Sequence, residues 1–335
     1  MKEKKKLNFI GFWSGFDKTH NLFCDILQER FDIEISDQPD YLIASVFGNP
    51  LQYLEYDCVR ILFTGEPLVP DFNLFDYAIG FDYLSFPDQN IGNRYYRYPL
   101  CFNNYKRLKK HVDGMSFDEA KKILSQKKYF CNFLYGHQSA KGEREHIFHA
   151  LEKYKRVESA GSFLNNMPDG LVIPYSEKKM DFLKLCKFTI ACESISYPGF
   201  VTEKLINPFY SDSIPIYYGN RLVNQEFNER AMINLHQFSS IEEGLEKVIE
   251  VDQDDTLFIQ MLMEPKLIAP DYLDNLFVGL KEFLFSIFSQ TPEQAFRRMR
   301  FYIQKEHESF LKEYKQFHNS LEYRIYKKRK SKTHR

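Results

Sequence analysis

Short apolar runs alternate with segments of helical spacing in the first part of the chain. The apolar runs at residues 7–13, 40–47, 59–63 and 76–80 have the length and composition of buried strands. Residues 20–30 instead repeat their apolar side chains at the spacing of one helix face. Strands that alternate with helices in this way predict a parallel, doubly wound α/β sheet.

The same alternation starts again after a basic and polar stretch that ends in a predicted helix at residues 117–126. We predict strands at residues 128–135, 157–161, 188–192, 213–218 and 231–235, and helices at residues 142–154, 176–187, 201–211 and 240–250. The sequence therefore predicts an α/β protein with two Rossmann-like domains, residues 1–125 and 126–290, and a helical segment with a basic tail at residues 291–335. Tandem sheets of this kind predict that the domains face a ligand cleft at the carboxyl ends of their strands.

The length and composition agree with a folded protein of two domains. The chain has 335 residues, of which 44% are hydrophobic and 27% are charged, and these values exclude a disordered, collagen-like or disulfide-dense protein. Its longest apolar stretches fall well short of the ~18–20 residues of a membrane helix. The six cysteines form no C-x-x-C pair and the first residues lack a signal-peptide core, so we expect free thiols and a cytoplasmic protein.

The overall charge of −1 hides an uneven distribution. Residues 1–6 carry a net +3 and residues 321–335 a net +6, which leaves −10 on the sequence between them. An acidic body with basic ends is not typical of a nucleic-acid-binding protein. We expect the C-terminal basic tail either to be solvated or to hold the protein peripherally on an anionic surface, the inner face of the cytoplasmic membrane.

Residues 188–219 hold the densest group of side chains that could carry chemistry. A predicted strand delivers Glu193 to a loop, and Thr202 then stands where a helix N-cap belongs, directly before Glu203 and Lys204. The free N–H groups of a helix start favour a phosphate, and Lys204 adds a full positive charge. In this arrangement Lys204 holds a diphosphate while Glu203 accepts hydrogen bonds from sugar hydroxyls. The alternative is a capped surface helix with a solvated charge pair.

This segment resembles the donor-binding motif of glycosyltransferase family 10, the α-1,3/4-fucosyltransferases. The family motif reads approximately Phe-Glu-Asn-Ser, a short loop, and then Tyr-Val-Thr-Glu-Lys. This chain has Cys-Glu-Ser-Ile at residues 192–195 and Phe-Val-Thr-Glu-Lys at residues 200–204, with the loop spacing of the bacterial members. The run at residues 213–219 is also similar to the family. The positions that depart from the usual residues are Cys192, Ser194, Ile195 and Phe200.

Two further segments are similar to the same family. The stretch from residue 128 to Arg144 resembles the segment that carries a diphosphate-binding arginine, and residues 163–166 resemble its continuation. In the first domain, Thr-Gly-Glu-Pro at residues 64–67 resembles the family's catalytic-base loop, which implies that the base is Glu66. The alternatives are a surface arginine on a charged helix and a loop carboxylate that caps a backbone N–H.

The resemblance implies a GT-B type fold and an inverting α-1,3-fucosyltransferase. Such an enzyme moves L-fucose from GDP-β-L-fucose to the O3 hydroxyl of GlcNAc in an N-acetyllactosamine-type glycan, a β-galactoside of the kind that a lipopolysaccharide O-antigen can carry. In this role Glu66 is the general base. The donor-binding residues that the resemblance implies are Arg144, Glu193, Ser194, Phe200, Glu203 and Lys204.

The resemblance implies no required metal or other cofactor, although it allows stimulation by a divalent cation. Arg144, Lys204 and the helix start would stabilise the negative charge on the departing GDP. His146 and His149 lack the further ligands of a recognisable metal site. The Asp-Gln-Asp run at residues 252–254 follows a predicted helix, where we expect a solvated turn.

Two other functions stay open at the level of the sequence. The departures at Ser194 and Phe200 would also suit a transferase for another nucleotide-activated sugar. A glycan-binding protein on a transferase fold without activity is the alternative that is not an enzyme. Dinucleotide oxidoreductases and P-loop NTPases are disfavoured, because the sequence has neither G-x-G-x-x-G nor a phosphate-loop lysine motif.

Overall fold

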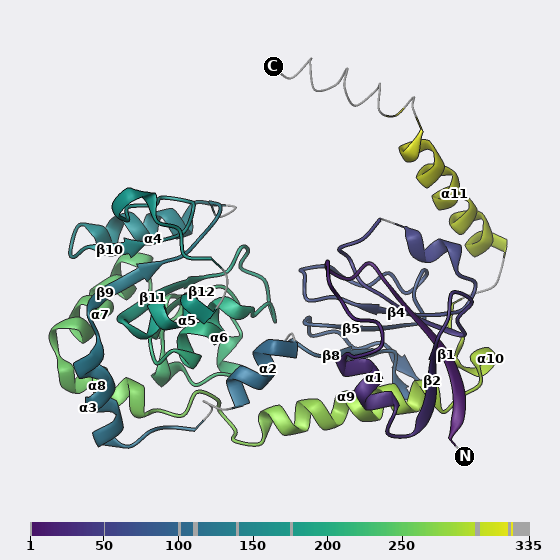
Figure 1. Ribbon diagram of the computed structural model, residues 1–335, viewed down its shortest axis with the longest axis horizontal. Coiled ribbons are helices and arrows are strands. Elements are labelled where there is room, and N and C mark those ends of the chain that lie inside the picture. The colour runs from purple at the N-terminus through teal and green to yellow at the C-terminus, as the bar shows by residue number, and fades with distance from the viewer. Residues whose placement is uncertain are drawn as a thin grey trace. The chain divides into compact units, whose positions relative to one another are not determined.

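A computed structural model describes residues 2–49, 51–99, 102–109, 113–138, 141–174, 177–298, 302–320 and 323 (Figure 1). The chain forms two compact units, each built on its own parallel sheet. The first unit comprises Met1–Gly80, Leu84–Tyr98 and Val278–Arg335, and the second comprises Phe81–Tyr83 and Pro99–Phe277. The prediction of an α/β protein with two Rossmann-like domains is confirmed.

The first unit is built on a six-stranded sheet in which all neighbouring strands are parallel, in the order β2-β1-β3-β4-β5-β8. Its strands are β1 (Glu3–Ile10), β2 (Phe31–Ile35), β3 (Tyr41–Ala44), β4 (Val59–Phe63), β5 (Tyr77–Gly80) and β8 (Tyr95–Arg97). The hairpin β6 (Pro87–Asp88) and β7 (Gly92–Asn93) lies outside this sheet. The helices of this part of the chain are α1 (Leu22–Leu27), η1 (Gln52–Glu55), α10 (Pro292–Ala295) and α11 (Tyr302–Asn319), together with the later part of α9 (Tyr272–Phe288).

Strand β1 begins earlier than the apolar pattern predicts. Its charged outer half pairs with β2, a strand that the pattern did not reveal. Lys5 in this half is buried, and its ammonium lies 5.6 Å from the centre of the Phe31 ring and 5.9 Å from that of the Tyr41 ring. A lysine can bury its aliphatic stem and place its charge over aromatic faces, so a charged segment can still form part of a sheet.

The C-terminal segment packs on the first unit. Asp76, directly before β5, accepts hydrogen bonds from the backbone N–H groups of Arg297 (2.7 Å) and Arg298 (2.9 Å) and pairs with the Arg298 guanidinium. On α11, Glu308 pairs with the buried Arg60 at 3.1 Å. The C-terminal segment is therefore helical over residues 302–319, as predicted, and this helix packs on the first unit. The basic tail lies outside the described residues, apart from Tyr323.

The second unit is built on a five-stranded parallel sheet in the order β10-β9-β11-β12-β13. Its strands are β9 (Tyr129–Phe133), β10 (Val157–Ser159), β11 (Cys186–Cys192), β12 (Ile214–Tyr218) and β13 (Ile233–Asn234). Its α-helices are α2 (Phe102–Lys109), α3 (Phe117–Gln126), α4 (Glu143–Glu152), α5 (Glu177–Lys184), α6 (Glu203–Tyr210), α7 (Ile241–Gln253) and α8 (Asp255–Met263). Short 3-10 turns form η2 (Pro168–Gly170), η3 (Val223–Gln225), η4 (Glu229–Ala231) and η5 (Leu235–Gln237).

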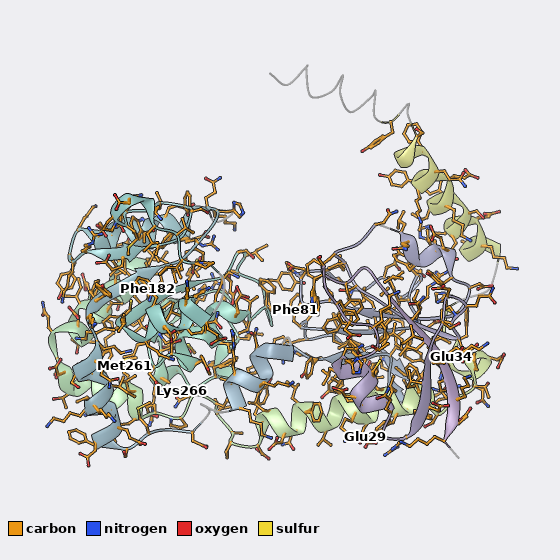
Figure 2. All side chains as sticks on the ribbon, in the orientation of Figure 1. Glu29, Glu34, Phe81, Phe182, Met261 and Lys266 are labelled. Carbon is orange, nitrogen blue, oxygen red and sulfur yellow. The ribbon has the colours of Figure 1, made fainter. Side chains whose placement is uncertain are left out.

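Aromatic rings fill much of the interior of the second unit. Phe133 and Phe188 lie in its main core with ring neighbours at edge-to-face or tilted angles, as aromatic pairs prefer. A smaller, separate cluster forms around Phe182, which Figure 2 labels in the second unit, and it includes Ala160, Leu183 and Cys186. These buried rings therefore have a packing role.

The boundaries of the two units differ from those of the expected domains 1–125, 126–290 and 291–335. Helix α3 belongs to the second unit, because its Ala120 is part of that unit's core. The end of α9 belongs to the first unit, where Phe288 stacks on Tyr41 with ring centres 4.3 Å apart. The apolar side chains at this end of α9 therefore pack on the sheet of the first unit. No helix within the described ranges combines the length and apolar character needed to cross a bilayer.

The described cysteines agree with the expectation of free thiols. Five of the six cysteines fall in the described ranges, and all five are buried and free. Burial raises the pKa of the Cys58 and Cys186 thiols to about 12, so these groups are inert at neutral pH.

Candidate donor site

The start of helix α6 is organised as the sequence predicts. Thr202 is the N-cap, with an extended backbone, and its hydroxyl accepts a hydrogen bond from the Lys204 N–H at 3.4 Å. Gly199 turns the preceding loop with φ +82°, and a side chain there would meet the Phe81 carbonyl oxygen at 2.5 Å. The loop is therefore closed by a glycine that no larger residue can replace, and it fixes the point at which the helix begins.

Glu193 is buried directly behind this helix start. Its carboxylate accepts hydrogen bonds from the Thr202 backbone N–H at 2.8 Å and from the Thr202 hydroxyl at 2.6 Å. The Lys204 ammonium lies 3.7 Å away. Burial raises the pKa of Glu193, while Lys204 and Thr202 oppose this rise. The carboxylate thus holds the capping residue and the lysine in place from behind.

A pocket of about 340 Å³ opens in the second unit beside this helix start. It is bounded by residues from β9, α4, α5, β11 and α6, so the carboxyl ends of two neighbouring strands contribute to it. This is the edge at which open α/β sheets bind ligands. The polar and charged side chains among its lining residues are Asn132, His137, Gln138, Arg144, Lys179, Thr189, Ser194, Glu203, Lys204 and Asn207.

Arg144 enters the pocket from the first turn of α4. It is buried, and its guanidinium donates to the His137 carbonyl oxygen at 2.7 Å and to the Cys192 carbonyl oxygen at 3.2 Å. The guanidinium also lies 3.9 Å from the centre of the Tyr135 ring. These contacts fix a planar, permanently charged group in the pocket, the type of group that binds phosphate oxygens in a bidentate manner. The alternative of an ordinary surface arginine is therefore wrong.

Lys204 and Glu203 form an ion pair of 3.2 Å in the same pocket. Burial favours the neutral amine of Lys204, but Glu193 and Glu203 raise its pKa above the usual value. Burial likewise opposes ionisation of Glu203, but Lys204 and Lys179 lower its pKa. Both groups are consequently charged at neutral pH, in a partly desolvated site where their interactions with a ligand are strong.

Lys179 on α5 is a charged pocket residue that the sequence did not single out. It lines the pocket with Arg144 and Lys204. Burial lowers its pKa, Glu203 opposes this effect, and Lys204 adds to it. The sequence feature that could have identified Lys179 is its position four residues before the buried Leu183, which places it on the inner side of α5. The adjacent Lys178 is exposed.

The remaining predicted donor residues, Ser194, Phe200 and Glu193, differ in their position relative to the pocket. Ser194 is exposed and lines the pocket. Phe200 is only 3% exposed and packs against Phe81 with ring centres 5.3 Å apart, and it is not among the residues that line the pocket. Glu193 lies behind the pocket as described. The donor contacts of these three residues stay predictions.

Glu66 lies in the first unit, in the loop that follows β4. Strand β4 is an inner strand of the sheet and ends at Phe63, so Glu66 stands at the carboxyl edge as expected. The Thr64 hydroxyl accepts the Glu66 backbone N–H at 3.0 Å and so shapes the turn. Glu66 is exposed, and within the described part of the chain its carboxylate makes no hydrogen bond or ion pair. A backbone-capping role for this carboxylate is therefore not observed.

The prediction of a solvated turn at residues 252–254 is wrong for its first residue. Asp252 is buried at the end of α7 and pairs with Lys187 at 3.0 Å and with Lys155 at 3.1 Å. Asp254 caps α8 by accepting the Thr256 N–H at 2.8 Å. This run therefore ties helices to the sheet. His146 pairs with Glu242 at 2.7 Å, and no cluster of metal-ligating side chains occurs among the described residues.

Two family profiles match this chain. The profile of the alpha-(1,3)-fucosyltransferase FucT N-terminal domain matches residues 7–105, and that of the glycosyltransferase family 10 (fucosyltransferase) C-terminal domain matches residues 124–263. The chain belongs to glycosyltransferase family 10. The second match contains every residue that lines the candidate pocket, and the first contains Glu66. The family that the motif around α6 resembles is thus confirmed, and the matches extend over parts of both units.

Similar proteins include alpha-(1,3)-fucosyltransferase FucT of Helicobacter pylori, with 30% identity over 275 residues, which are 71% of this chain and 55% of that protein. Alpha-(1,3)-fucosyltransferase B of Drosophila melanogaster is 27% identical over 171 residues, 44% of this chain and 38% of that protein. The chain thus matches about half or less of the length of these curated relatives.

Solved structures of an alpha1,3-fucosyltransferase share the fold. A complex with GDP-fucose has a TM-score of 0.65 and 23% identity, and the match covers 85% of this chain and 91% of that chain. A complex with GDP has the same TM-score and 24% identity, with 84% and 91% covered. The GT-B type fold expected of a family 10 member is therefore confirmed.

Proposed function

We propose that this chain is an inverting α-1,3-fucosyltransferase. It transfers L-fucose from GDP-β-L-fucose to the O3 hydroxyl of GlcNAc in an N-acetyllactosamine-type glycan. The observation that carries the proposal is the pocket at the start of α6, which is lined by Arg144, Lys179, Lys204 and Glu203. Three cations and one carboxylate suit a ligand that joins a diphosphate to a sugar with hydroxyl groups.

Direct displacement accounts for the change from a β-linked donor to an α-linked product. The O3 oxygen of the acceptor attacks the anomeric carbon of fucose and forms the new bond, while the bond from that carbon to the β-phosphate oxygen breaks. The electron pair of the broken bond leaves with GDP. Arg144, Lys204 and the positive end of the α6 dipole stabilise this charge as it develops.

Glu66 is the general base of this reaction. It removes the proton of the attacking hydroxyl, so that the product is a neutral glycoside and the carboxylate becomes a carboxylic acid. Its exposed position at the carboxyl edge of the sheet supports this role, because a base must reach a substrate hydroxyl within hydrogen-bond distance. The matched FucT N-terminal profile also spans this residue.

We propose that the reaction requires no metal ion. The three cations in the pocket supply charge that a divalent ion supplies in other nucleotide-sugar enzymes. Transfer in the presence of a chelator tests this point, and stimulation by added Mg²⁺ or Mn²⁺ is compatible with it. Loss of all activity in the chelator, restored by a divalent ion, would contradict it.

We also propose a cytoplasmic enzyme that acts at the inner face of the cytoplasmic membrane on a glycan such as a lipopolysaccharide O-antigen. The net charge of +6 at residues 321–335 supports the surface contact. Binding to anionic vesicles should weaken with salt and on deletion of this tail. Unchanged vesicle binding after the deletion would reject the contact.

The decisive experiment measures fucose transfer from GDP-fucose to N-acetyllactosamine, with analysis of the product linkage. An α-1,3-linked product confirms the proposal, and no transfer to this or related β-galactosides by folded protein rejects it. A panel of other nucleotide sugars in the same assay tests whether the exposed Ser194 in the pocket reflects a different donor.

A further inference from the structure

Two aromatic rings stand exposed at the carboxyl edge of the first unit's sheet. Trp13 follows β1 and is 42% exposed, and Phe47 follows β3 and is 52% exposed. Their ring centres are 6.4 Å apart and their planes meet at 75°. Because β1 and β3 are neighbouring strands, the two rings form an open corner on one edge of the sheet. We call these two residues the aromatic corner.

The rings beneath the aromatic corner hold it rigidly. Phe12 stacks on Phe16 with ring centres 4.0 Å apart, and Trp13 lies edge-on to both rings, at 5.6 Å from Phe12 and 5.3 Å from Phe16. Phe12 also stacks on Phe63, the last residue of β4, at 5.9 Å. The corner is therefore connected by direct ring contacts to the strand that leads into the Glu66 loop.

The backbones of the two loops are locked together as well. Gly11 has φ +69°, and a side chain there would meet the Ser45 carbonyl oxygen at 2.4 Å. A side chain at Gly48 would meet the Gly11 Cα atom at 2.6 Å. Phe47 lies between Ser45 and Gly48, so its position relative to Trp13 is set by close backbone packing. A preformed site of this kind loses little conformational entropy when a ligand binds.

The composition of the two loops restricts the ligand. Residues 11–16 and 45–49 contain no charged side chain. A rigid, uncharged, aromatic surface that stays exposed favours a neutral ligand with an apolar face. A sugar ring is such a ligand, since its C–H groups can lie on an aromatic face while its hydroxyl groups stay in water. Galactose presents C3–H, C4–H and C5–H on one face, because its O4 hydroxyl is axial.

Building on the proposed function, we propose that the aromatic corner binds the terminal β-galactose of the acceptor. The strand order β1-β3-β4 places the corner on the same edge of the same sheet as the Glu66 loop. In an N-acetyllactosamine acceptor the galactose is the sugar next to the GlcNAc that reacts. Trp13 and Phe47 thus hold the non-reacting sugar of the acceptor, and they are positioning residues for the hydroxyl that Glu66 deprotonates.

The single tryptophan of the chain makes this testable without an enzyme assay. All tryptophan fluorescence comes from Trp13, so a sugar that covers this ring changes the emission directly. We expect lactose to produce a saturable change, and cellobiose to bind at least fivefold more weakly. These two disaccharides differ only in the configuration at C4 of the terminal sugar. Absence of a saturable response to lactose in folded protein overturns the proposal.

Variants of Phe47 provide the second arm. Phe47→Ala should weaken lactose binding about tenfold and raise the KM for the acceptor without altering the affinity for GDP. Phe47→Tyr keeps the ring and should stay within twofold of the wild type. Phe117→Ala removes a ring that is 51% exposed on α3 in the other unit and serves as the matched control. Equal lactose affinity in wild type and Phe47→Ala overturns the proposal.

The outcomes separate this site from the proposed reaction. If lactose binds and Phe47→Ala weakens it, but no fucose is transferred from GDP-fucose, the aromatic corner stands and the proposed function fails. If fucose is transferred but Trp13 does not respond and the acceptor KM is unchanged in Phe47→Ala, the proposed function stands and the corner fails.

Discussion

Glu193 and Thr202 are joined by two hydrogen bonds that connect the end of a strand to the start of the helix nine residues later in the chain. The carboxylate accepts both the backbone N–H (2.8 Å) and the hydroxyl (2.6 Å) of Thr202. Thr202 in turn caps α6 through the Lys204 N–H. The geometry of the helix start, and so of the candidate donor pocket, depends on this one buried carboxylate.

Replacement of Glu193 by Gln should therefore weaken both the fold and the donor site. An amide can accept only one of the two hydrogen bonds, and the positive charge of Lys204 loses a partner at 3.7 Å. Loss of a buried hydrogen bond to a charged group costs about 1.5–3 kcal/mol. We expect a decrease of this size in the free energy of unfolding in urea, together with weaker GDP binding in a calorimetric titration.

Glu246→Gln on the exposed face of α7 is the matched control for this substitution. It changes the same chemical group without a buried partner, so stability and GDP affinity should stay at the wild-type values. If Glu193→Gln behaves like this control, the carboxylate does not organise the helix start.

Replacement of Glu66 by Gln should remove turnover while GDP binding is kept. The substitution preserves the shape of the side chain but removes its ability to accept a proton, and a general base contributes about 10²–10⁴-fold to the rate. The backbone hydrogen bond of this residue to Thr64 does not involve the carboxylate, so the loop should keep its conformation. Rates of transfer and GDP affinity measured on the same preparation check both points.

The pH dependence of transfer separates a base from a merely structural carboxylate. A base gives an acid limb in the profile of kcat/KM, and this limb should disappear in the residual activity of Glu66→Gln. A variant that keeps more than a tenth of the wild-type rate would exclude Glu66 as the base.

Lys179→Ala should weaken GDP binding, whereas Lys178→Ala should not. Lys179 lines the pocket and its charge is partly desolvated, so a bound phosphate gains from it more than from a solvated lysine. We expect a loss of about tenfold in GDP affinity, equivalent to about 1.4 kcal/mol. Binding of guanosine, which carries no phosphate, should be unchanged.

Lys178 and Lys179 are adjacent on α5 and have the same chemistry, so the pair isolates the effect of position. Calorimetry of both variants at two salt concentrations provides the comparison. Equal losses in the two variants would mean that net charge, not contact in the pocket, determines the affinity.

The part of the site that the sequence predicted is the part defined by local signals. The N-cap at Thr202, the two charges after it and the strand before it lie within a few residues of one another, and each has a preferred place at a helix start. The same is true of Glu66, which follows a short buried strand directly. Periodicity and capping could therefore locate these residues before any tertiary contact was known.

The parts that the sequence missed depend on contacts between distant segments. Strand β2 could not be predicted from the apolar pattern, because it pairs with the charged half of β1, and that half gives no sign in the sequence that it lies in the sheet. Asp252 looked like part of a turn because Lys155 and Lys187, which bury it, are far away in the sequence. Lys179 had no local signal that distinguished a pocket lysine from its exposed neighbour except its position relative to the buried residues of α5.

Two lysines with lowered pKa values, Lys266 and Lys127, predict how the free energy of unfolding depends on pH. Lys266 lies almost fully buried and donates to the carbonyl oxygens of Leu262 (2.8 Å) and Glu264 (3.0 Å). Burial lowers its pKa to about 8, and it lowers the pKa of Lys127 to about 8 as well. Between pH 8 and the usual lysine value of 10.5 the unfolded chain binds more protons than the folded chain at these positions.

The free energy of unfolding therefore increases as the pH rises from 8 to about 10, because the unfolded chain holds more protons on these lysines. Below pH 8 the lysines are protonated in both the folded and the unfolded chain, so this increase is absent. Buried tyrosines and cysteines with raised pKa values act in the opposite direction, so the comparison must be between variants. Lys266→Met removes one contribution, and the stability of the wild type relative to this variant should rise between pH 8 and 10. Urea unfolding at four pH values measures it, with the more exposed Lys247→Met as the control. A constant difference between wild type and Lys266→Met across this range would show that Lys266 titrates at its usual pKa in the folded protein.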